Sequence, residues 1–354
     1  MGRTYGLNPG RRCDYGGAMR NLWALPLGRL ERYCQPFDWP GGSFKVSPQA
    51  SCLGPEWIGV ERYFALIEET IPFRRLSPAD HGRLLWQQGR GPLAEIERTA
   101  CVLIDHLNTT PNFFHWFLDA LPRLFAAEAY EQRFGLPCHI VLPQTLRPWQ
   151  WDSLRFLAVP QERLIAIPDA PRARGFGLAN LVSTFSHRHI RHSPTGHFDA
   201  CSADTIRLLS DRLFVGSCSA AHPPSPGQRL YISRGGVSHR RVRNEDAVME
   251  VLSPHGFQRV CLDQLCLRDQ IHLFRGASHV IAAHGGALTN LLHISPGCQV
   301  LEVFQAGHGP RPEFFQLAAI RGATYSFCTA ASLNARHDIE IAPAQLRTFL
   351  EASL

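Results

Sequence analysis

The second half of the chain has the clearest pattern of hydrophobic and polar positions. Short apolar runs, each suited to a buried strand, alternate with segments in which apolar residues recur every three or four positions, as on one face of a helix. The predicted strands cover 230–232, 257–262, 279–283 and 298–304, and the predicted helices begin at Asn244, at Leu267 and near Gly286. This alternation over short connections favours a parallel sheet with helices on both faces. Ligands bind such sheets beyond the carboxyl ends of the strands, so we expect a site there.

The first half is less regular. Apolar runs predict strands at 101–104, 138–142, 163–167 and 178–185, with helices from Asn112 and over 149–157. Residues 1–95 are rich in glycine, proline and arginine and show little periodicity. A polar stretch with several histidines and prolines predicts a linker near 186–227. The pattern as a whole indicates an α/β protein in two parts.

Length and composition limit the class of protein. A chain of 354 residues with 45% hydrophobic residues has material for about two domains. No apolar run reaches the length of a membrane span, and residues 1–20 lack the apolar core of a secretory leader. The eleven cysteines are scattered, with no Cys-x-x-Cys pair, which is typical of reduced thiols. We therefore expect a soluble, cytoplasmic protein.

The charge pattern is compatible with a phosphate-bearing ligand and argues against nucleic acid as a partner. The net charge is +6, and Lys45 is the only lysine, so almost all of the basic residues are arginine. A biased genome composition explains this most simply, but it still leaves a chain able to bind phosphate bidentately. The basic residues form no dense block, so nucleic acid is not an expected partner. Peripheral contact with the inner face of a membrane stays open.

A glycine pair follows the predicted strand 279–283. The segment His284-Gly285-Gly286-Ala287 leads from this strand into a helix. Free N–H groups and the helix dipole favour an anion there, and the missing Cβ atoms let a phosphate approach the backbone. A glycine pair alone fits an unliganded tight turn equally well. Its place at the ligand edge of the sheet favours the phosphate site.

Two other strands of this half end in, or contain, polar residues. Ser233 and Arg234 follow the strand 230–232, and we favour Arg234 as a diphosphate ligand, whereas Arg243 in the following loop is expected to be solvated. Glu302 lies within the apolar strand 298–304, where a carboxylate is costly unless it has a partner. It could pair with an arginine of the core or accept hydrogen bonds from the hydroxyls of a ribose.

Asn112, His115 and Asp119 have a spacing that places them on one face of a helix. The Asp119 carboxylate could then bond the His115 imidazole, fix its tautomer and raise its basicity. Pro122 is expected to end or kink this helix. By spacing alone, an N-capped helix with an incidental His–Asp pair is the simpler interpretation.

No pattern typical of a metal or dinucleotide site is present. His187, His189, His192 and His197 lie in a polar stretch without matching cysteines or carboxylates, so we expect a solvated linker. No two aspartates are separated by one residue, which excludes the Asp-x-Asp metal and sugar-nucleotide motif. Walker, Gly-x-Ser-x-Gly and Gly-x-Gly-x-x-Gly motifs are also absent. We expect no metal and no cofactor.

Taken together, residues 112–304 resemble glycosyltransferase family 61. The resemblance rests on the order and spacing of Asn112, His115 and Asp119, followed by 231–234, 241–245, 265–270, 284–290, Pro296-Gly297 and Glu302. Gly286-Ala287 stands where the family more often has Ala-Gly, an exchange that should keep the backbone cradle. Cys266 replaces the usual serine helix cap, and Asp269 replaces the usual glutamate.

The resemblance implies a GT-B fold, in which two Rossmann-like domains face each other across a cleft. It divides the chain into an N-terminal segment 1–95 on the acceptor side, an acceptor-side domain 96–200, and a nucleotide-sugar domain 201–354 with a C-terminal helix. It implies a metal-independent, inverting transfer of a sugar from a nucleotide donor, UDP being favoured, to a hydroxyl of a glycan. Surface polysaccharide synthesis is the expected setting, and residues 1–95 are the expected seat of acceptor choice.

The resemblance also assigns roles to residues. His115 is the expected base with Asp119 as its partner, Asp119 itself is the alternative base, and Asn112 completes the catalytic set. The expected donor-binding residues are Ser233, Arg234, Arg241, His284, Gly285, Gly286, Ala287, Asn290 and, at the ribose, Glu302. A different class of function remains open, namely a catalytically silent GT-B protein that binds nucleotide sugar or glycan within a biosynthetic complex. A dinucleotide-dependent enzyme is disfavoured because Gly-x-Gly-x-x-Gly is missing.

Overall fold

The structure is a computed structural model that describes most of the chain. The described residues are 2–39, 41–54, 57–61, 65–70, 77–90, 94–104, 112–168, 175–184, 188–193, 196–218, 225–307 and 310–354. They form two compact units, each made of two stretches of chain. Unit 1 comprises Met1–Arg11 and Trp39–Thr205, and unit 2 comprises Arg12–Asp38 and Ile206–Leu354.

Unit 1 is a mixed α/β structure. Its strands are β1 (Arg3–Asn8), β4 (Gly42–Leu53), β5 (Ile58–Val60), β6 (Glu95–Val102), β7 (His139–Pro143), β8 (Leu164–Ile167), β9 (Gly175–Thr184) and the hairpin β10 (Arg188–Ser193) and β11 (Gly196–Cys201). Its helices are η4 (Glu68–Thr70), α1 (Pro78–Gly89), α2 (Phe113–His115), η5 (Trp116–Ala120), η6 (Leu121–Arg123), α3 (Leu124–Phe134), α4 (Pro148–Phe156) and η7 (Gln161–Arg163). The helix α5 (Ala203–Ser217) begins in this unit and continues into unit 2.

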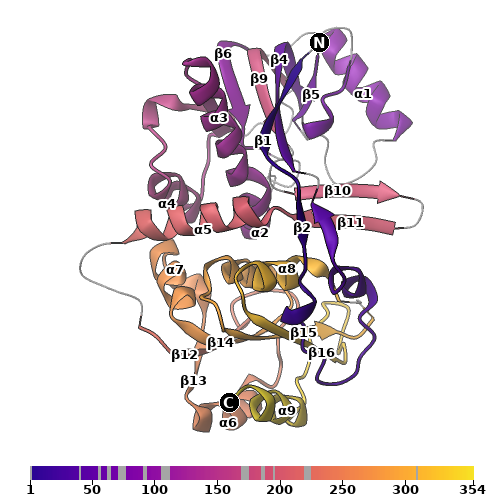
Figure 1. The fold of residues 1–354 in the computed structure, drawn as a ribbon, viewed down its shortest axis with the longest axis vertical. Helices are drawn as coiled ribbons and strands as arrows, with labels where there is room; N and C mark the ends of the chain where they lie inside the picture. The colour runs from indigo at the N-terminus through magenta and orange to yellow at the C-terminus, as the bar shows by residue number, and fades with distance from the viewer. Residues whose placement is uncertain are drawn as a thin grey trace. The chain divides into compact units, whose positions relative to one another are not determined.

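The main sheet of unit 1 has seven strands in the order β1-β4-β9-β6-β7-β8, with β5 beside β4. The strands β9, β6, β7 and β8 are parallel, whereas β4 runs antiparallel to β9, β1 and β5. Helix α3 lies on one side of this sheet and α1 on the other (Figure 1). Among the parallel strands the order reverses at β6 and β9, and such a reversal marks the usual ligand position in open α/β sheets.

Unit 2 is built around a parallel sheet. The C-terminal stretch contributes β12 (Gln228–Ile232), α6 (Glu245–Leu252), η8 (Ser253–His255), β13 (Phe257–Val260), η9 (Leu262–Gln264), α7 (Leu267–Arg275), β14 (Ala277–Ala283), η10 (Gly286–His293), β15 (Gln299–Gln305), α8 (Pro312–Ile320), β16 (Thr324–Ala330) and α9 (Pro343–Ser353). The N-terminal stretch contributes η1 (Gly16–Ala18) and η2 (Gly28–Tyr33). The short strands β2 (Arg11–Cys13) and β3 (Phe37–Trp39) pair where the chain changes unit.

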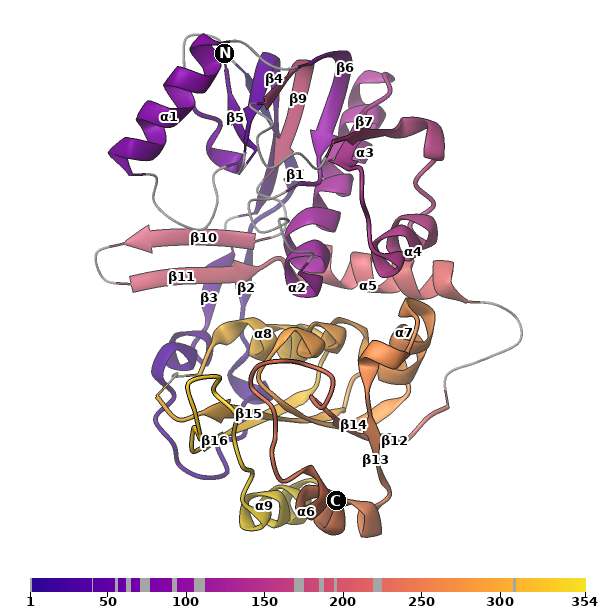
Figure 2. The ribbon, with the colours of Figure 1, turned by 180° about the vertical axis from the view of Figure 1, so that it is seen from behind.

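The five strands of this sheet lie in the order β13-β12-β14-β15-β16, and all neighbouring pairs are parallel. The order reverses at β12 and β14, which makes this pair the topological switch point. Helices α6 and α9 cover one face, and α7 and α8 cover the other (Figure 2). The mixed α/β class and the parallel sheet expected from the sequence are confirmed.

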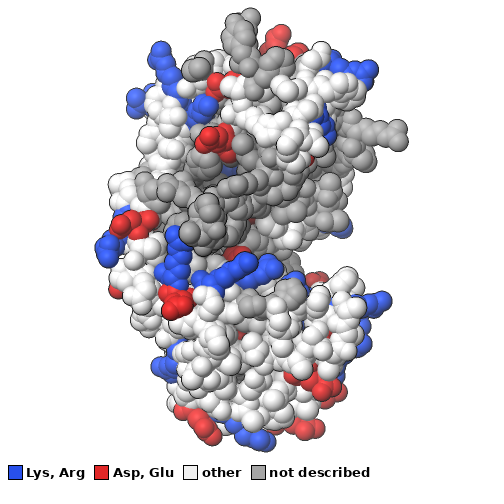
Figure 3. Space-filling view, turned by 90° about the vertical axis from the view of Figure 1, so that its right-hand side faces the viewer, with Lys and Arg blue, Asp and Glu red and all other residues white. Residues whose placement is uncertain are grey.

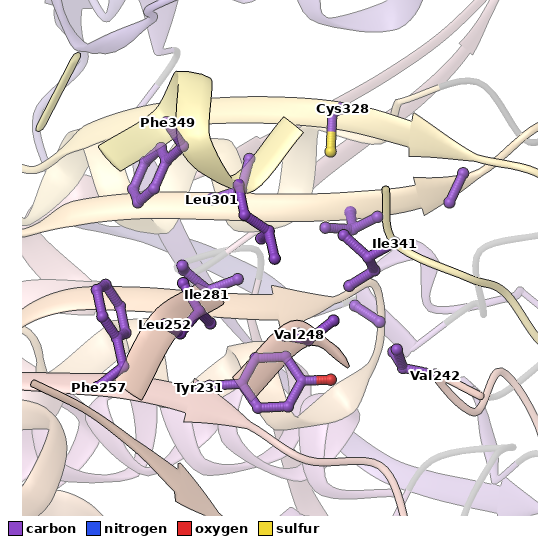
Figure 4. Packing of buried hydrophobic residues seen from close by; sticks show 14 of the residues in the cluster. Tyr231, Val242, Val248, Leu252, Phe257, Ile281, Leu301, Cys328, Ile341 and Phe349 are labelled. Carbon is purple, nitrogen blue, oxygen red and sulfur yellow. The ribbon is translucent and has the colours of Figure 1, made fainter. Parts of the chain in front are cut away.

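The core of unit 2 explains why the hydrophobic pattern of the second half of the chain is so regular. On the face covered by α6 and α9, alternate strand residues such as Tyr231, Ile281 and Leu301 pack against Leu252 and Phe349 (Figure 4). All five are at most 2% exposed. Burial of one large apolar side chain contributes about 1.5–3 kcal/mol, so this face alone stabilises the unit substantially. Strands buried on both faces leave the continuous apolar runs seen in the sequence.

Residues 12–38 are part of unit 2, whereas the division expected from the sequence kept residues 1–95 together as one segment. Met19 forms a parallel bridge to Tyr325 at the edge of the sheet, and the Arg20 N–H donates to the Tyr325 carbonyl at 2.7 Å. Leu30 in η2 is completely buried, and η2 contacts α8. Edge bridges and short 3-10 turns have no sequence periodicity, which explains why the pattern gave no sign of this packing.

The linker predicted near 186–227 is wrong for most of its length. Residues 188–193 and 196–201 form the hairpin β10–β11, and 203–217 form α5. Strand pairing satisfies the backbone of a polar hairpin whatever its side chains, so polarity alone does not indicate a linker. None of the helices in the described ranges is both long enough and apolar enough to cross a membrane.

The surface charge agrees with the composition. On the face drawn in Figure 3, small groups of basic and acidic side chains are separated by uncharged surface, and the described residues of this face carry no dense basic block. The eleven cysteines all lie in the described part of the chain, and no disulfide links them there.

The packing of residues 12–38 can be tested with Leu30→Ala. Loss of this buried side chain should cost about 2–5 kcal/mol of unfolding free energy. Hydrogen exchange should show the lost protection in α8 and β16 of unit 2. Leu208→Ala is the matched control, because Leu208 is 49% exposed and should change stability by less than about 0.5 kcal/mol. Lost protection in β6 and β7 instead would contradict the assignment of this stretch to unit 2.

Candidate functional site

The switch point of unit 2 brings together two segments that the sequence singled out. β12 and β14 are adjacent and parallel, with Ile232 opposite Ala282. Their carboxyl ends continue into Ser233-Arg234 and His284-Gly285 respectively. The two segments therefore lie side by side at the edge where ligands bind an open parallel sheet.

Arg234 is held in place by the backbone of the loop that follows it. Its Nε donates to the Arg240 carbonyl at 2.9 Å, and its Nη2 donates to the His239 carbonyl at 3.1 Å. Arg240 has a φ of 56°, a left-handed conformation that costs a non-glycine residue free energy and that tends to occur at functional sites. The guanidinium lies against Gly285, where an added Cβ would collide with Nη1. A side chain at position 285 would therefore displace the Arg234 guanidinium from this position.

Positive charge gathers at this edge, and the nearby Asp263 carboxylate offsets part of it without forming an ion pair with Arg234. Burial and the charge of Arg240 lower the pKa of Arg234, although Asp263 acts in the opposite direction. Burial and the charge of Arg311 lower the pKa of Arg240. Within the described part of the chain, no carboxylate lies at ion-pair distance from Arg234, Arg240 or Arg311. A bound anion would supply the missing negative charge.

Two helices begin near this cluster. Gly285 is the N-cap of η10, and Arg311 is the N-cap of α8, which follows β15. The first N–H groups of a helix have no partner within it and favour negative charge. Position 286 does not require a glycine, because an added Cβ there would meet nothing within 4 Å. The cradle expected over 284–287 therefore depends on Gly285 rather than on the pair.

Ser233 is occupied by an interaction that the sequence did not predict. Glu245, at the start of α6, accepts hydrogen bonds from Ser233 Oγ at 2.7 Å, Tyr231 Oη at 3.2 Å and the Arg234 N–H at 3.0 Å. Ser233 Oγ also accepts from the Gly235 N–H at 3.1 Å. Glu245 therefore fixes the end of β12 from which Arg234 projects.

The loop from Arg241 to Asn244 is fixed by the chain after β16. Asp338 accepts from the Arg241 N–H and forms an ion pair with Arg243, each at 3.0 Å. Arg241 Nε donates to the Val237 carbonyl within the loop at 2.5 Å. Arg243, expected to be solvated, is therefore paired. The Asn244 side chain bonds the backbone N–H and carbonyl of Ile341 and does not cap α6.

Glu302 is completely buried, and both of its oxygens have partners. His284 Nδ1 lies 2.5 Å from Oε1, and Tyr325 Oη donates to Oε2 at 2.6 Å. The protein partners are thus a histidine and a tyrosine and not the core arginine considered from the sequence. Apolar periodicity could place Glu302 in a strand, but it could not show which side chains faced it from neighbouring strands.

Asn290 lies inside η10 and is 1% exposed. Its Nδ2 donates to Gln270 Oε1 at 3.1 Å and to the Ala287 carbonyl at 3.2 Å. These bonds tie the turn after Gly285 to helix α7. Asn290 therefore braces this edge of the sheet, and Ala287 contributes its backbone carbonyl.

In unit 1, Asn112, His115 and Asp119 follow β6 at the edge of its own switch point. Asn112 is the N-cap of α2, where its side chain accepts from the His115 N–H at 3.4 Å. His115 Nδ1 and Asp119 Oδ2 are 2.6 Å apart, so the bond expected from the spacing is present. The His115 side chain is 17% exposed and that of Asp119 is 3% exposed, so the carboxylate lies behind the imidazole.

The helix that carries this pair does not end at Pro122. It changes to a π-helical turn over Trp116–Ala120, then to a 3-10 turn over Leu121–Arg123, and continues as α3. Proline has no N–H and its ring clashes with the carbonyl four residues earlier in an α-helix. The wider π turn, in which the Leu121 N–H bonds the Trp116 carbonyl, accommodates it. π turns occur often at functional sites.

The described residues contain no group of three or more histidine, cysteine, aspartate or glutamate side chains that could hold a metal ion. His187 and the side chains of His189, His192 and His197 lie outside what the structure describes. Each unit therefore contributes one candidate cluster: the His115–Asp119 pair in unit 1, and the guanidinium cluster with its glycine turn in unit 2.

Comparison with known families gives one match. A family model described as Glycosyltransferase 61 matches residues 113–301, which is more than half of the chain. The matched range includes His115, Asp119, Arg234 and the turn after β14, and it ends one residue before Glu302. A search of curated proteins found no match to the chain.

The anion site can be tested with inorganic pyrophosphate and a matched pair of glycine variants. Gly285→Ala should weaken pyrophosphate binding about tenfold or more, because the new methyl group displaces the Arg234 guanidinium and removes a charge-assisted hydrogen bond. Gly286→Ala should bind as the wild type does. Isothermal titration calorimetry measures both dissociation constants. Equal affinities of the two variants would contradict a site at Arg234.

Proposed function

The chain belongs to glycosyltransferase family 61, and from this premise we propose a metal-independent, inverting transfer of a sugar from a UDP-sugar to a hydroxyl of a glycan. The proposed setting is the cytoplasmic synthesis of a surface polysaccharide. The nucleotide sugar would bind unit 2, and the acceptor would bind unit 1. In this proposal the two units are the Rossmann-like halves of a GT-B enzyme.

The guanidinium cluster of Arg234, Arg240 and Arg311 is the observation that carries the donor side. Arg234 is partly buried and oriented by two carbonyls, and among the described residues no carboxylate pairs with it, with Arg240 or with Arg311. A diphosphate carries fixed negative charge, and arginine binds its oxygens bidentately. When the bond from the sugar to the diphosphate breaks, negative charge grows on the diphosphate. Cationic groups already in place stabilise that charge, as a divalent metal does in other enzymes.

The His115–Asp119 pair supports the acceptor side. A bond from Nδ1–H to the carboxylate leaves Nε2 as the nitrogen that takes the proton from the acceptor hydroxyl while the oxygen attacks the sugar. The two exposed fractions favour His115 over Asp119 as the base, because the carboxylate is almost completely covered. Asp119 then keeps the tautomer and stabilises the imidazolium that forms. Asn112 fixes the start of the helix.

Nucleotide selectivity tests the donor assignment. UDP should raise the thermal unfolding temperature more than GDP, CMP or NAD, because a ligand that binds only the native state stabilises it. The UDP shift should persist in EDTA if no metal takes part. A shift with GDP or CMP alone would change the donor class, and no shift with any of the four would contradict a nucleotide site.

A second test separates catalysis from binding at His115. His115→Ala should lower the rate of UDP release from a UDP-sugar, with glycan acceptor present, by a factor of about 100 or more, while UDP binding changes little. Asp119→Asn should lower kcat with a smaller effect, since it leaves the imidazole in place. His81→Ala, an exposed histidine of α1, is the control. An unchanged rate of UDP release in His115→Ala would refute the assignment of His115 as the base. UDP-sugar binding without UDP release in the wild type would favour the catalytically silent binding protein.

A further inference from the structure

Helix α1 of unit 1 turns polar residues toward the protein. Four residues share its inward face at spacings of three and four positions: Asp80, Arg83, Leu84 and Gln87. Leu84 is 2% exposed and packs against β4 and β5, so it anchors the helix to the core. The other three are polar. A surface helix ordinarily turns an apolar stripe inward and its polar residues outward, so the polarity of α1 is reversed.

The polar residues of the inward face are held by contacts within unit 1. Arg83 Nη1 donates to the Gly54 carbonyl at 2.7 Å and to Gln87 Oε1 at 3.3 Å. Arg83 Nη2 lies 3.8 Å from the Asp80 carboxylate. That carboxylate also accepts from the Ser77 N–H and Oγ, each at 2.8 Å, which caps the start of the helix. These contacts fix the rotation of α1 about its axis and thereby the face that it turns to solvent.

The outward face of α1 is uncharged and open. We call its five residues the outer face: Pro78, Gly82, Leu85, Trp86 and Gly89. Leu85 is 49% exposed and Trp86 is 58% exposed. A Cβ added at either glycine would meet nothing within 4 Å. Both ribbon views show α1 at the periphery of unit 1 (Figure 1, Figure 2). Neighbouring large apolar side chains left in water mark a surface that binds something.

The charge at the border of the outer face is positive. The Arg90 guanidinium lies over the Trp86 ring, 4.6 Å from its centre. No carboxylate of the described chain lies at ion-pair distance from Arg90. Asp80 is the only acid of the helix, and it is turned inward with a side chain that is 14% exposed. Other elements of unit 1 expose acids, such as Glu68 on η4 and Glu95 on β6, so complementarity to an anionic surface belongs to α1 and not to the unit as a whole.

The size of the outer face argues against a protein partner. The helix has 12 residues, so it is about 18 Å long and about 10 Å wide, and one face covers about 200 Å². A stable protein–protein interface takes about 800 Å² from each partner. A lipid surface needs less, because binding grows with the apolar area that inserts and with attraction to anionic lipids. Tryptophan favours the headgroup level of a bilayer, and arginine extends from an apolar surface to the phosphates.

We propose that α1 docks unit 1 on an anionic lipid bilayer, with Leu85 and Trp86 inserted at the boundary between headgroups and acyl chains and Arg90 at the lipid phosphates. The helix axis lies in the plane of the surface, because the outer face runs along its whole length. Docking by one short helix is reversible. It uses none of the residues assigned to donor or acceptor, so this inference goes beyond the proposed function and is tested separately from it.

The test uses the full chain and vesicles of equimolar phosphatidylcholine and phosphatidylglycerol, with the partition coefficient measured by co-sedimentation. Leu85→Ala and Trp86→Ala should each lower it about fivefold to tenfold, because less apolar area inserts. Leu208→Ala and Trp151→Ala are the matched controls, since these side chains are 49% and 42% exposed on other helices. Both controls should bind as the wild type does. Circular dichroism of each variant checks that the fold is retained.

The electrostatic part is tested at Arg90. Arg90→Gln should weaken binding to the mixed vesicles about fivefold, the effect of one basic residue at an anionic surface. Arg90→Lys keeps the charge and should bind within about twofold of the wild type. The wild type should bind pure phosphatidylcholine vesicles about fivefold or more weakly than the mixed ones. Damage to the helix end would not be repaired by lysine.

Three results would overturn the inference: no binding of the wild type to the mixed vesicles, equal binding to the two vesicle types, or equal losses in the Trp86→Ala and Trp151→Ala variants. A dimer seen by light scattering without vesicles, and dissociated by Trp86→Ala, would also overturn it, because the occupant would then be a second copy. The thermal shift with UDP should be the same in Trp86→Ala and the wild type. Vesicle binding without any UDP shift in the wild type would overturn the proposed donor and leave this inference standing.

Discussion

Positive charge without ion-pair partners at the carboxyl edge of β12 and β14 is the constraint on which the arrangement of this part of unit 2 depends, as far as the described residues show. Like charges held close together destabilise a fold unless something opposes them. Here the opposing interactions are local: two carbonyls orient Arg234, and Glu245 fixes the strand end that bears it. Gly285 leaves the space in which the guanidinium lies. In the proposed function, this conformational restraint would keep an anion site formed before the substrate binds, and such preorganisation favours stabilisation of a leaving group.

The sequence was most informative where the burial of apolar side chains alone sets the hydrophobic pattern. Strands buried on both faces must be apolar throughout, so the parallel strands and the helices between them could be placed from periodicity alone. Periodicity failed where backbone hydrogen bonds or packing at an edge decide the structure. The polar hairpin β10–β11 and the bridge from Met19 to Tyr325 are examples.

The contacts of the candidate site also fall into two kinds, those that the sequence could predict and those that it could not. Spacing within one helix predicted the His115–Asp119 contact, and the end of β12 predicted the position of Arg234, because neighbours along one element are fixed by its geometry. The partners of Glu302 and the role of Glu245 join residues from separate elements. No alternation along a single strand specifies which side chain faces it from the next strand. That information resides in the sheet order, which became available only with the structure.

The interleaved course of the chain affects how the protein is made. Residues 12–38 leave the ribosome early, yet their packing partners lie in 206–354 and are synthesised last. The strands and helices of unit 1 can assemble in the interval, because domains generally fold as they emerge. The early stretch, with Leu30 and other apolar side chains, must wait exposed until β16 and α8 exist. A nascent chain of this enzyme therefore needs protection from aggregation, and an excised C-terminal half would expose the surface which that stretch covers.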